Sequence, residues 1–351
     1  MPRPIIVMRQ RFFATQYSPQ ITIHTAAMSL PLSKTNVPLS DHQRPLTWLT
    51  VIAVVSTAAL WGGNPVAAKY TLMSDYTHYG LPPITVSGIR FLLATFFMLI
   101  WCQFEKSPWK ITRQQLPTCL IAGTLLAAQI GTFTIGIQLS NSTHTTILIN
   151  TFIIWIFGYE HFSSQTQRMT KLQVIGCALA AASALVTLLL KTSADITNQD
   201  TSDLPELLGD CIIVISGALL AAKILFIKAN LKTIQSGTLM LWHDLIAVIW
   251  FVLIAAYFER DQIFLDQVNQ QVVWGLIYQG VIVGGLCFAI QTSLLNKYSA
   301  SRITVFSFLT PIFGIAAAAA LRNDPLSYWT FLSLALVAAG IYLVNRPSVN
   351  Q

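Results

Sequence analysis

Long stretches of uninterrupted apolar sequence dominate this chain of 351 residues. The stretches at 179–190 and 312–321 contain no charged residue and show no polar stripe at helical spacing. A helix that is apolar all round belongs in lipid or in the core of a large protein. Only 10% of the residues are charged, against about 25% in an average soluble domain. Too little polar sequence remains to coat a soluble core, so the sequence predicts an integral membrane protein whose main partner is the lipid bilayer.

Ten segments are long and apolar enough to be interpreted as membrane-spanning helices. They lie at about 47–68, 83–104, 116–139, 142–160, 171–191, 207–228, 237–258, 272–295, 299–321 and 326–345. Backbone groups in lipid must be hydrogen-bonded within the segment, which a helix achieves. The segments lack the apolar–polar alternation of a membrane β-barrel. We therefore expect an all-α fold with ten transmembrane helices.

The two ends of the chain differ from this apolar body. Residues 1–46 carry five basic residues and no acidic residue before Asp41. We expect a disordered basic N-terminal tail, although residues 1–27 could instead be a leader or could precede a later start at Met28. Residues 346–351 are expected to form a short C-terminal tail.

The basic residues predict the orientation in the membrane. With the N-terminus inside, fifteen Lys and Arg residues flank the spans on the cytoplasmic side, and four lie outside: Lys69, Lys191, Arg260 and Arg322. Because cytoplasmic loops are enriched in Lys and Arg, we expect both termini in the cytoplasm and a multi-pass protein of the plasma (inner) membrane. The net charge of +7 then follows from topology, and nucleic acid is not an expected partner.

The second half of the sequence repeats the first. Residues 147–158 align with 303–314 at an offset of 156, the third span aligns with the eighth at 157, and the first with the sixth at 159. Each match alone is weak, so the evidence for an internal repeat is the near-constant offset between the matches. Five spans per repeat is an odd number, so the halves are expected to be inverted, as in many secondary transporters. The sequence thus predicts two five-helix repeats, 47–191 and 207–345, joined by an acidic outer loop at 192–206.

Four motifs resemble a known family. LWGGNPVAAKY (60–70) and PITVSGIRFLLATFFML (83–99) resemble the opening of EamA-type carriers of the drug/metabolite transporter superfamily. SASRITVFSFLTPIFGIAAAAAL (299–321) and WTFLSLALVAAGIYLVN (329–345) resemble the closing helices of the second EamA repeat. The resemblance implies a 5+5 helical basket with a central cavity and export or exchange of small metabolites. Trp155 departs from the pattern, since the family often has proline there and at its repeat mate, Pro311.

Charged residues inside spans are candidates for function because lipid penalises unpaired charge. Arg90 in the second span is interpreted either as an anchor for an anionic group in the cavity or as an ion pair that fixes the span. Lys223 and Asp244 lie at similar depth on consecutive spans. They could form a static salt bridge or act in gating or substrate binding, or Lys223 could extend to the inner surface. Arg90 is the approximate repeat mate of Asp244. Because the halves are expected to be inverted, mates lie on opposite sides of the membrane, and we expect no direct contact between these two.

Uncharged polar residues extend the candidate site. Trp61 and Asn64 either contact the solute or belong to a packing hinge, and Pro65 in the same motif is expected to bend its helix, as is Pro311 in the ninth span. Gln129, Asn150 and Gln291 are interpreted either as interhelical hydrogen-bonding residues or as cavity lining.

Two His–acid pairs, His243 with Asp244 and His161 with Glu160, make protons a candidate coupling ion. Adjacent helical residues point roughly 100° apart, however, so adjacency alone does not make a pair. No metal-ligand spacing and no phosphate-binding loop occurs, so we expect no metal, no cofactor and no ATP-driven pumping.

These features favour a secondary transporter of small solutes that works by alternating access at a central cavity. The candidate solutes are amino-acid-like, nucleobase-like or drug-like. The alternatives are a membrane channel or non-transporting scaffold and, less favoured, an intramembrane enzyme. The sequence shows neither a selectivity-filter repeat nor a catalytic motif such as HExxH.

Overall fold

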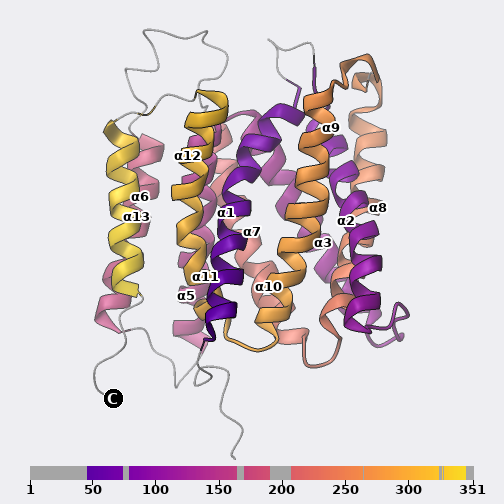
Figure 1. Cartoon of the computed structure of the whole chain (residues 1–351), viewed down its shortest axis with the longest axis horizontal. Helices are drawn as coiled ribbons and strands as arrows, with labels where there is room; N and C mark the ends of the chain where they lie inside the picture. The colour runs from indigo at the N-terminus through magenta and orange to yellow at the C-terminus, as the bar shows by residue number, and fades with distance from the viewer. Residues whose placement is uncertain are drawn as a thin grey trace, which may run out of the picture. The chain divides into compact units, whose positions relative to one another are not determined.

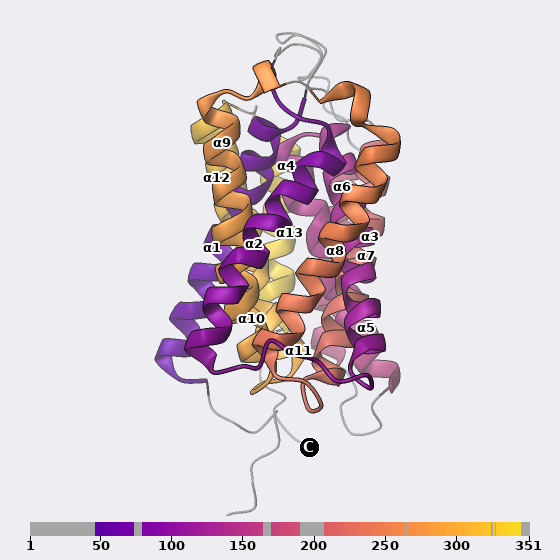
Figure 2. The same ribbon diagram turned by 90° about the vertical axis from the view of Figure 1, so that its right-hand side faces the viewer.

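The computed structural model describes residues 46–73, 79–163, 170–189, 207–263, 265–323, 326 and 328–344. The expected N-terminal tail (but for Leu46), the acidic loop at 192–206 and the C-terminal tail lie outside these described residues. The described residues form a bundle of helices that run up and down side by side (Figures 1 and 2). Beyond helices and turns, they contain one isolated β-bridge, between Leu72 and Leu81.

The first half contains three long helices followed by a broken one. In chain order the elements are α1 (Trp48–Thr71), α2 (Pro83–Glu105), α3 (Leu116–Gln138), α4 (Ser142–Leu148), the 3-10 turn η1 (Ile149–Thr151), α5 (Phe152–Ser163) and α6 (Lys171–Leu189). Side-chain caps define several helix starts. The Thr47 hydroxyl accepts from the backbone N–H of Thr50 at 3.2 Å, and Asn141 accepts from that of His144 at 2.7 Å.

The second half follows the same order. Its elements are α7 (Leu207–Asn230), α8 (Ser236–Phe258), the 3-10 turns η4 (Arg260–Gln262) and η5 (Leu265–Gln267), α9 (Gln270–Ile277), the π-helical segment η6 (Tyr278–Cys287), α10 (Phe288–Leu295), α11 (Ala300–Thr304), the 3-10 segment η7 (Val305–Leu309), α12 (Thr310–Arg322) and α13 (Tyr328–Val344). Segment η6 joins α9 and α10 into one continuous helix, Gln270–Leu295.

Within the described residues, six of the ten predicted spans are single helices long and apolar enough to cross a membrane: α1, α2, α3, α7, α8 and Gln270–Leu295. Shorter apolar helices cover Lys171–Ser183, Thr310–Arg322 and Tyr328–Gly340.

In each of the helices expected at 142–160 and 299–321, the α-helical hydrogen bonding is broken by a 3-10 segment, although the backbone stays in the right-handed helical region at the junctions. In the first, the Asn150 side chain donates to the Thr146 carbonyl at 2.6 Å and so competes with the regular backbone bond. In the second, Pro311 has no N–H to give to the preceding turn. Pro65 behaves differently, since α1 continues through it as one helix.

The packing of helices in one half has a counterpart in the other. Helix α2 packs on α8, and α6 packs on α13 at the opposite edge of the bundle (Figure 1). Helix α3 packs on α7, and their repeat mates, the helix formed by α9 and η6 and helix α1, pack on each other in the same way. Helix α1 packs on α12, as α7 packs on α5 and η1.

Contacts at the two ends of the bundle are paired in the same way. We call the end at which α1 begins the proximal end and the opposite end the distal end. At the distal end, Lys69 Nζ donates to the carbonyl of Gln138 at 3.4 Å. At the proximal end, Lys228 Nζ donates to the carbonyl of Leu295 at 2.7 Å. Both bonds join the last turns of two helices, and the residues match at the sequence offsets of 159 and 157.

Helices α2 and α8 are tied together at both ends by a glutamate. At the distal end, the two carboxylate oxygens of Glu259 accept from the backbone N–H groups of Ile84 and Thr85 at 2.8 and 2.7 Å, which caps the start of α2. At the proximal end, Glu105 accepts from the Ser236 hydroxyl at the start of α8.

Candidate functional site

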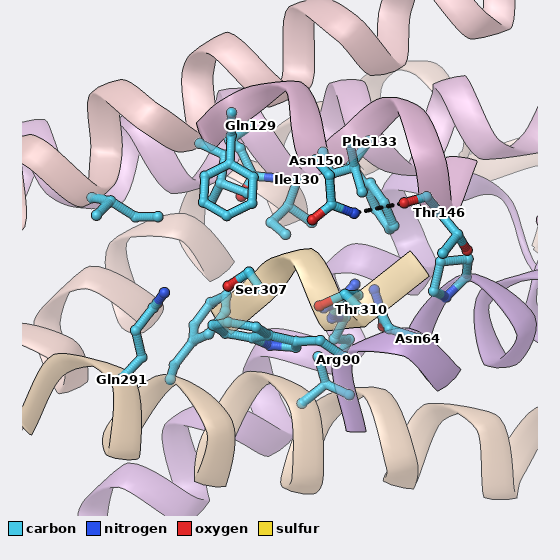
Figure 3. A pocket seen from close by; sticks show the side chains of 18 residues that line it. Asn64, Arg90, Gln129, Ile130, Phe133, Thr146, Asn150, Gln291, Ser307 and Thr310 are labelled. Carbon is cyan, nitrogen blue, oxygen red and sulfur yellow. Dashed lines mark hydrogen bonds between the residues drawn. The ribbon is translucent and has the colours of Figure 1, made fainter. Parts of the chain in front are cut away.

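A cavity with about 80 Å³ of space for water-sized molecules lies between helices from both halves (Figure 3). Its polar lining residues are Asn64, Arg90, Gln129, Thr146, Asn150, Gln291, Ser307 and Thr310. Its apolar lining residues are Trp61, Pro65, Ile130, Phe133, Ile149, Phe152, Leu220, Ile224, Val283 and Phe288. The wall is therefore mostly apolar with a few polar groups, a composition typical of small-molecule sites.

The broken helices supply the parts of the wall that face each other across the cavity in Figure 3. Asn150 comes from η1 and Ser307 from η7, and both segments are 3-10 turns. Irregular backbone at membrane depth is tolerated where it lines a cavity, and in transporters such segments commonly form the binding site.

The structure brings together six of the nine residues predicted to take part in binding or translocation. They are Trp61, Asn64, Arg90, Gln129, Asn150 and Gln291, and Pro65 joins them in the wall. Lys223, His243 and Asp244 are absent from the lining, as is Pro311.

Lys223 lies behind the wall. Its Nζ donates to Gln129 Oε1 at 3.0 Å and is 4.5 Å from the centroid of the Phe288 ring. Among the described residues, Asp244 is hydrogen-bonded to His243 and forms no salt bridge with Lys223. The predicted salt bridge is therefore wrong, because Gln129 and the aromatic ring satisfy the ammonium group instead. Extension to the surface is also wrong, since Lys223 is 3% exposed.

Arg90 is 2% exposed, and its guanidinium carbon is 5.2 Å from the centroid of the Phe91 ring. Its Nε has no hydrogen-bond partner among the described residues. As expected from the inverted repeat, Arg90 forms no ion pair with Asp244, although the two interact electrostatically. Two further lining atoms, Asn64 Oδ1 and Thr310 Oγ1, are also buried and find no hydrogen-bond partner in the described ranges.

His243 and Asp244 do form a pair, despite the expected divergence of adjacent helical side chains. His243 Nδ1 and Asp244 Oδ1 are 2.8 Å apart, and both side chains are fully buried. In the other candidate pair, Glu160 Oε1 accepts from the backbone N–H of Ser301 at 3.4 Å.

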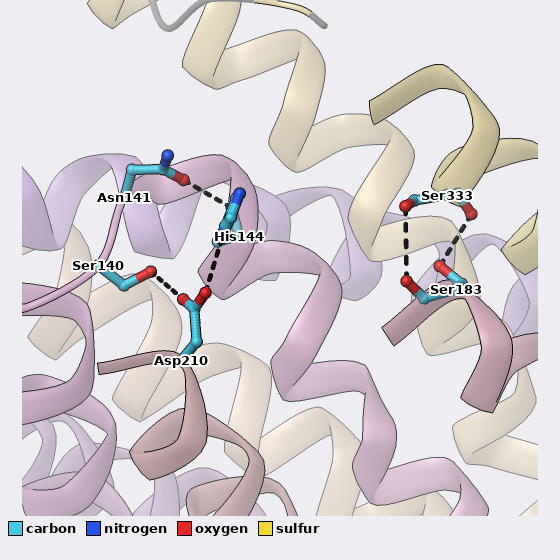
Figure 4. Close-up of polar contacts among 6 residues, drawn as sticks. All are labelled: Ser140, Asn141, His144, Ser183, Asp210 and Ser333. Carbon is cyan, nitrogen blue, oxygen red and sulfur yellow. Dashed lines mark hydrogen bonds and ion pairs between the residues drawn. The ribbon is translucent and has the colours of Figure 1, made fainter. Parts of the chain in front are cut away.

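A second His–acid pair was missed by the sequence reasoning. At the distal end, Asp210 accepts from the Ser140 hydroxyl at 2.5 Å and lies 2.9 Å from His144 Nδ1 (Figure 4). These residues join the start of α7 to the start of α4. Asp210 and His144 are far apart in the sequence, so their spacing gave no signal. The available sign was Asn141, a typical helix-capping residue, which marks the start of the helix that carries His144.

Comparison with known proteins identifies the family. The EamA-like transporter family matches residues 48–189 and again 207–346. The chain belongs to this family. The resemblance inferred from the four motifs is thereby confirmed, and the chain is an integral, multi-pass membrane protein of the transporter class.

Curated relatives of this EamA chain are distant but match along most of their length. "Uncharacterized transporter YoaV" of Bacillus subtilis (strain 168) is 21% identical over 84% of this chain and 95% of its own. A "Probable amino-acid metabolite efflux pump" of Salmonella typhimurium is 26% identical over 84% of this chain and 93% of its own. The protein of the same description in Escherichia coli (strain K12) is 23% identical over 83% and 93%.

A solved crystal structure shares the fold. It superposes with a TM-score of 0.64 at 12% identity, covering 85% of this chain and 97% of its own.

Proposed function

We propose that this EamA chain is a secondary transporter that exports or exchanges small metabolites by alternating access at the cavity in Figure 3. Amino-acid-like, nucleobase-like and drug-like solutes are the candidates. Two relatives described as probable amino-acid metabolite efflux pumps support the first class.

The observation that carries the proposal is the matched set of contacts at opposite ends of the bundle. The Lys69–Gln138 bond at the distal end and the Lys228–Leu295 bond at the proximal end follow the offsets of the sequence repeat. This supports ten spans arranged as two inverted repeats, 47–191 and 207–345. Two related halves of opposite orientation can exchange conformations, which opens a shared cavity to each side in turn.

The chemistry of the wall supports a small amphipathic solute. The unpartnered Arg90 Nε can donate to a carboxylate or other anionic group, and Asn64 Oδ1 can accept from a donor on the same solute. Gln129, Asn150 and Gln291 supply further polar contacts, while Trp61 and the apolar side chains hold the rest of the molecule. Leaving a buried polar atom unpaired is unfavourable, so a solute that pairs with these atoms gains affinity.

For orientation, we propose that both termini are cytoplasmic and that the protein lies in the plasma (inner) membrane. The first turn of α1 and the last turn of α13 lie at the same end of the bundle (Figure 1), which supports a common side for the two tails. The proximal end is then the cytoplasmic one. Transport, rather than an enzymatic reaction, is the activity that follows.

Flux into proteoliposomes tests the proposal. The full chain is reconstituted and a panel of labelled amino acids, nucleobases, aromatic carboxylates and lipophilic cations is screened by counterflow. We expect saturable counterflow of at least one class. Absence of counterflow for every class, or single-channel currents in a planar bilayer, would contradict a carrier.

A further inference from the structure

A buried titratable pair lies beside the cavity without being part of its wall. His243 and Asp244 on α8 are both 0% exposed and are joined by the 2.8 Å hydrogen bond. Within the part of the chain that the structure describes, His243 Nε2 and Asp244 Oδ2 have no hydrogen-bond partner. A histidine–aspartate pair with an unused atom on each side chain has room for one more proton.

The proton count of the pair follows from ordinary chemistry. With neutral imidazole and ionised carboxylate, one ring proton on Nδ1 makes the hydrogen bond, and the pair carries one negative charge. One added proton gives either an imidazolium–carboxylate pair or a neutral imidazole beside a carboxylic acid, with no net charge in both cases. Because an ionised carboxylate is costly in a buried site, the neutral form is accessible.

We propose that the His243–Asp244 pair is the proton-binding site of this transporter and that it binds its proton together with an anionic group held at Arg90. The inference rests on the proposed carrier function, for which it names the coupling ion and the charge of the solute.

Two basic side chains from neighbouring helices face the pair. Asp244 interacts electrostatically with Lys223 of α7 and Arg90 of α2, and His243 with Lys223. The other titratable groups on elements packed against α8 are Cys102 and Glu105 on α2, Cys119 on α3, and Arg260 and Asp261 in η4. Helix α10 has no titratable residue.

The pair and the cavity contact the same aromatic side chain, Phe288. The Phe288 ring lines the cavity, and its centroid is 6.3 Å from that of His243 and 6.0 Å from that of Trp61. Lys223 Nζ lies 4.5 Å from the same ring. One aromatic side chain thus separates the proton site from the solute site.

The sign of the coupling follows from the formal charges. With Arg90 and Lys223 protonated, Asp244 ionised and His243 neutral, these four buried side chains together carry one net positive charge. A bound anion brings the total to zero, and a proton on the pair then restores the charge of the empty site. Anion and proton therefore favour each other's binding, whereas a cationic solute and a proton oppose each other.

The first experiment needs no solute. Infrared difference spectra of the full chain in lipid nanodiscs are recorded during a pH titration, with the carbonyl band of a protonated carboxylic acid as readout. We expect a band that is absent from Asp244→Asn and retained in Asp210→Asn, the matched acid at the distal end. Retention of the whole band in Asp244→Asn would overturn the proton site.

A second variant, His243→Gln, tests the pair independently in case Asp244→Asn does not fold. It keeps a hydrogen-bond donor for Asp244 but removes the titrating ring, so we expect the band midpoint to move by at least one pH unit. An unchanged midpoint in a folded His243→Gln protein would overturn the pair as the site.

The second experiment uses benzoate as an apolar anion and tetraphenylphosphonium as an apolar cation in binding calorimetry. We expect the benzoate Kd to fall by up to about tenfold per pH unit on acidification, the limit for one linked proton, and this dependence to vanish in Asp244→Asn. An unchanged pH dependence in Asp244→Asn, or tighter cation binding on acidification, would overturn the coupling. Absence of benzoate binding at every pH would also overturn the coupling to an anion at Arg90, but not the proton site, and failure of the transport panel alone would leave the infrared result standing.

Discussion

Buried polar atoms without partners mark the cavity at the scale of single residues. Arg90 and Asn64 were predicted as site residues because charged and amide side chains stand out in an apolar span. Thr310 and Ser307 were not, since hydroxyl residues are common in membrane helices and can bond to their own backbone. Phe288 could not be found either, because one apolar residue among many gives no sequence signal. Its role depends on the three rings and the one ammonium group around it.

Arg90→Ala is expected to abolish counterflow while leaving a folded, inserted protein, because it removes the cation that the cavity offers to an anionic group. Counterflow in proteoliposomes and elution in size-exclusion chromatography measure the two effects. The matched control is Arg260→Ala, whose side chain is 74% exposed and is paired with the exposed Asp261. Equal flux in Arg90→Ala and the native chain would assign Arg90 to packing.

At the scale of elements, the spans were predictable and their breaks were not. Hydrophobic length located α1, α2, α3, α7 and α8 because lipid imposes that length. The breaks at η1 and η7 depend on local hydrogen bonds that compete with the helix. Pro311 is visible in the sequence at one break, but its mate at the other is Trp155, so proline alone did not reveal the pattern.

Two repeat-related glycines test the close packing of the broken helices. A Cβ on Gly314 would lie 2.9 Å from Thr146 Oγ1 and 3.0 Å from the carbonyl of Gly62, whereas one on Gly158 would meet nothing within 4 Å. Gly314→Ala is therefore expected to lower stability by about 1–3 kcal/mol. Gly158→Ala should be neutral or slightly stabilising, since alanine favours helix. Thermal unfolding in detergent compares them, and equal effects would refute the packing.

The glutamate cap on α2 is a second test at this scale. Glu259→Ala leaves two backbone N–H groups at the start of α2 without their acceptor, so stability is expected to fall by about 1–3 kcal/mol. Asp261→Ala, two residues away and 86% exposed, is expected to have no measurable effect. Both are compared by thermal unfolding, and equal midpoints would show that the cap contributes nothing.

For the whole molecule, the contacts that join the halves follow the offsets of the duplicated sequence. The offset that matches Arg90 to Asp244 also matches Glu105 to Glu259, and these two glutamates hold opposite ends of the same helix pair. The serines Ser183 and Ser333 bond reciprocally between α6 and α13, at 2.9 and 3.4 Å (Figure 4). Sequence could not predict which side chains would meet at each end, because that depends on how the two halves pack.

The most direct test of the central claim, that two related halves open one cavity to alternate sides, is a pair of spin-label distances. In a cysteine-free background, one pair of labels is placed at exposed proximal positions, Phe104 and Phe162, and another at exposed distal positions, Phe258 and Leu321. Distances are measured by pulsed electron resonance in lipid nanodiscs, with and without the solute that gives the largest counterflow. We predict that one distance lengthens as the other shortens. Two distances that stay constant, or that change in the same direction, would contradict alternating access by inverted repeats.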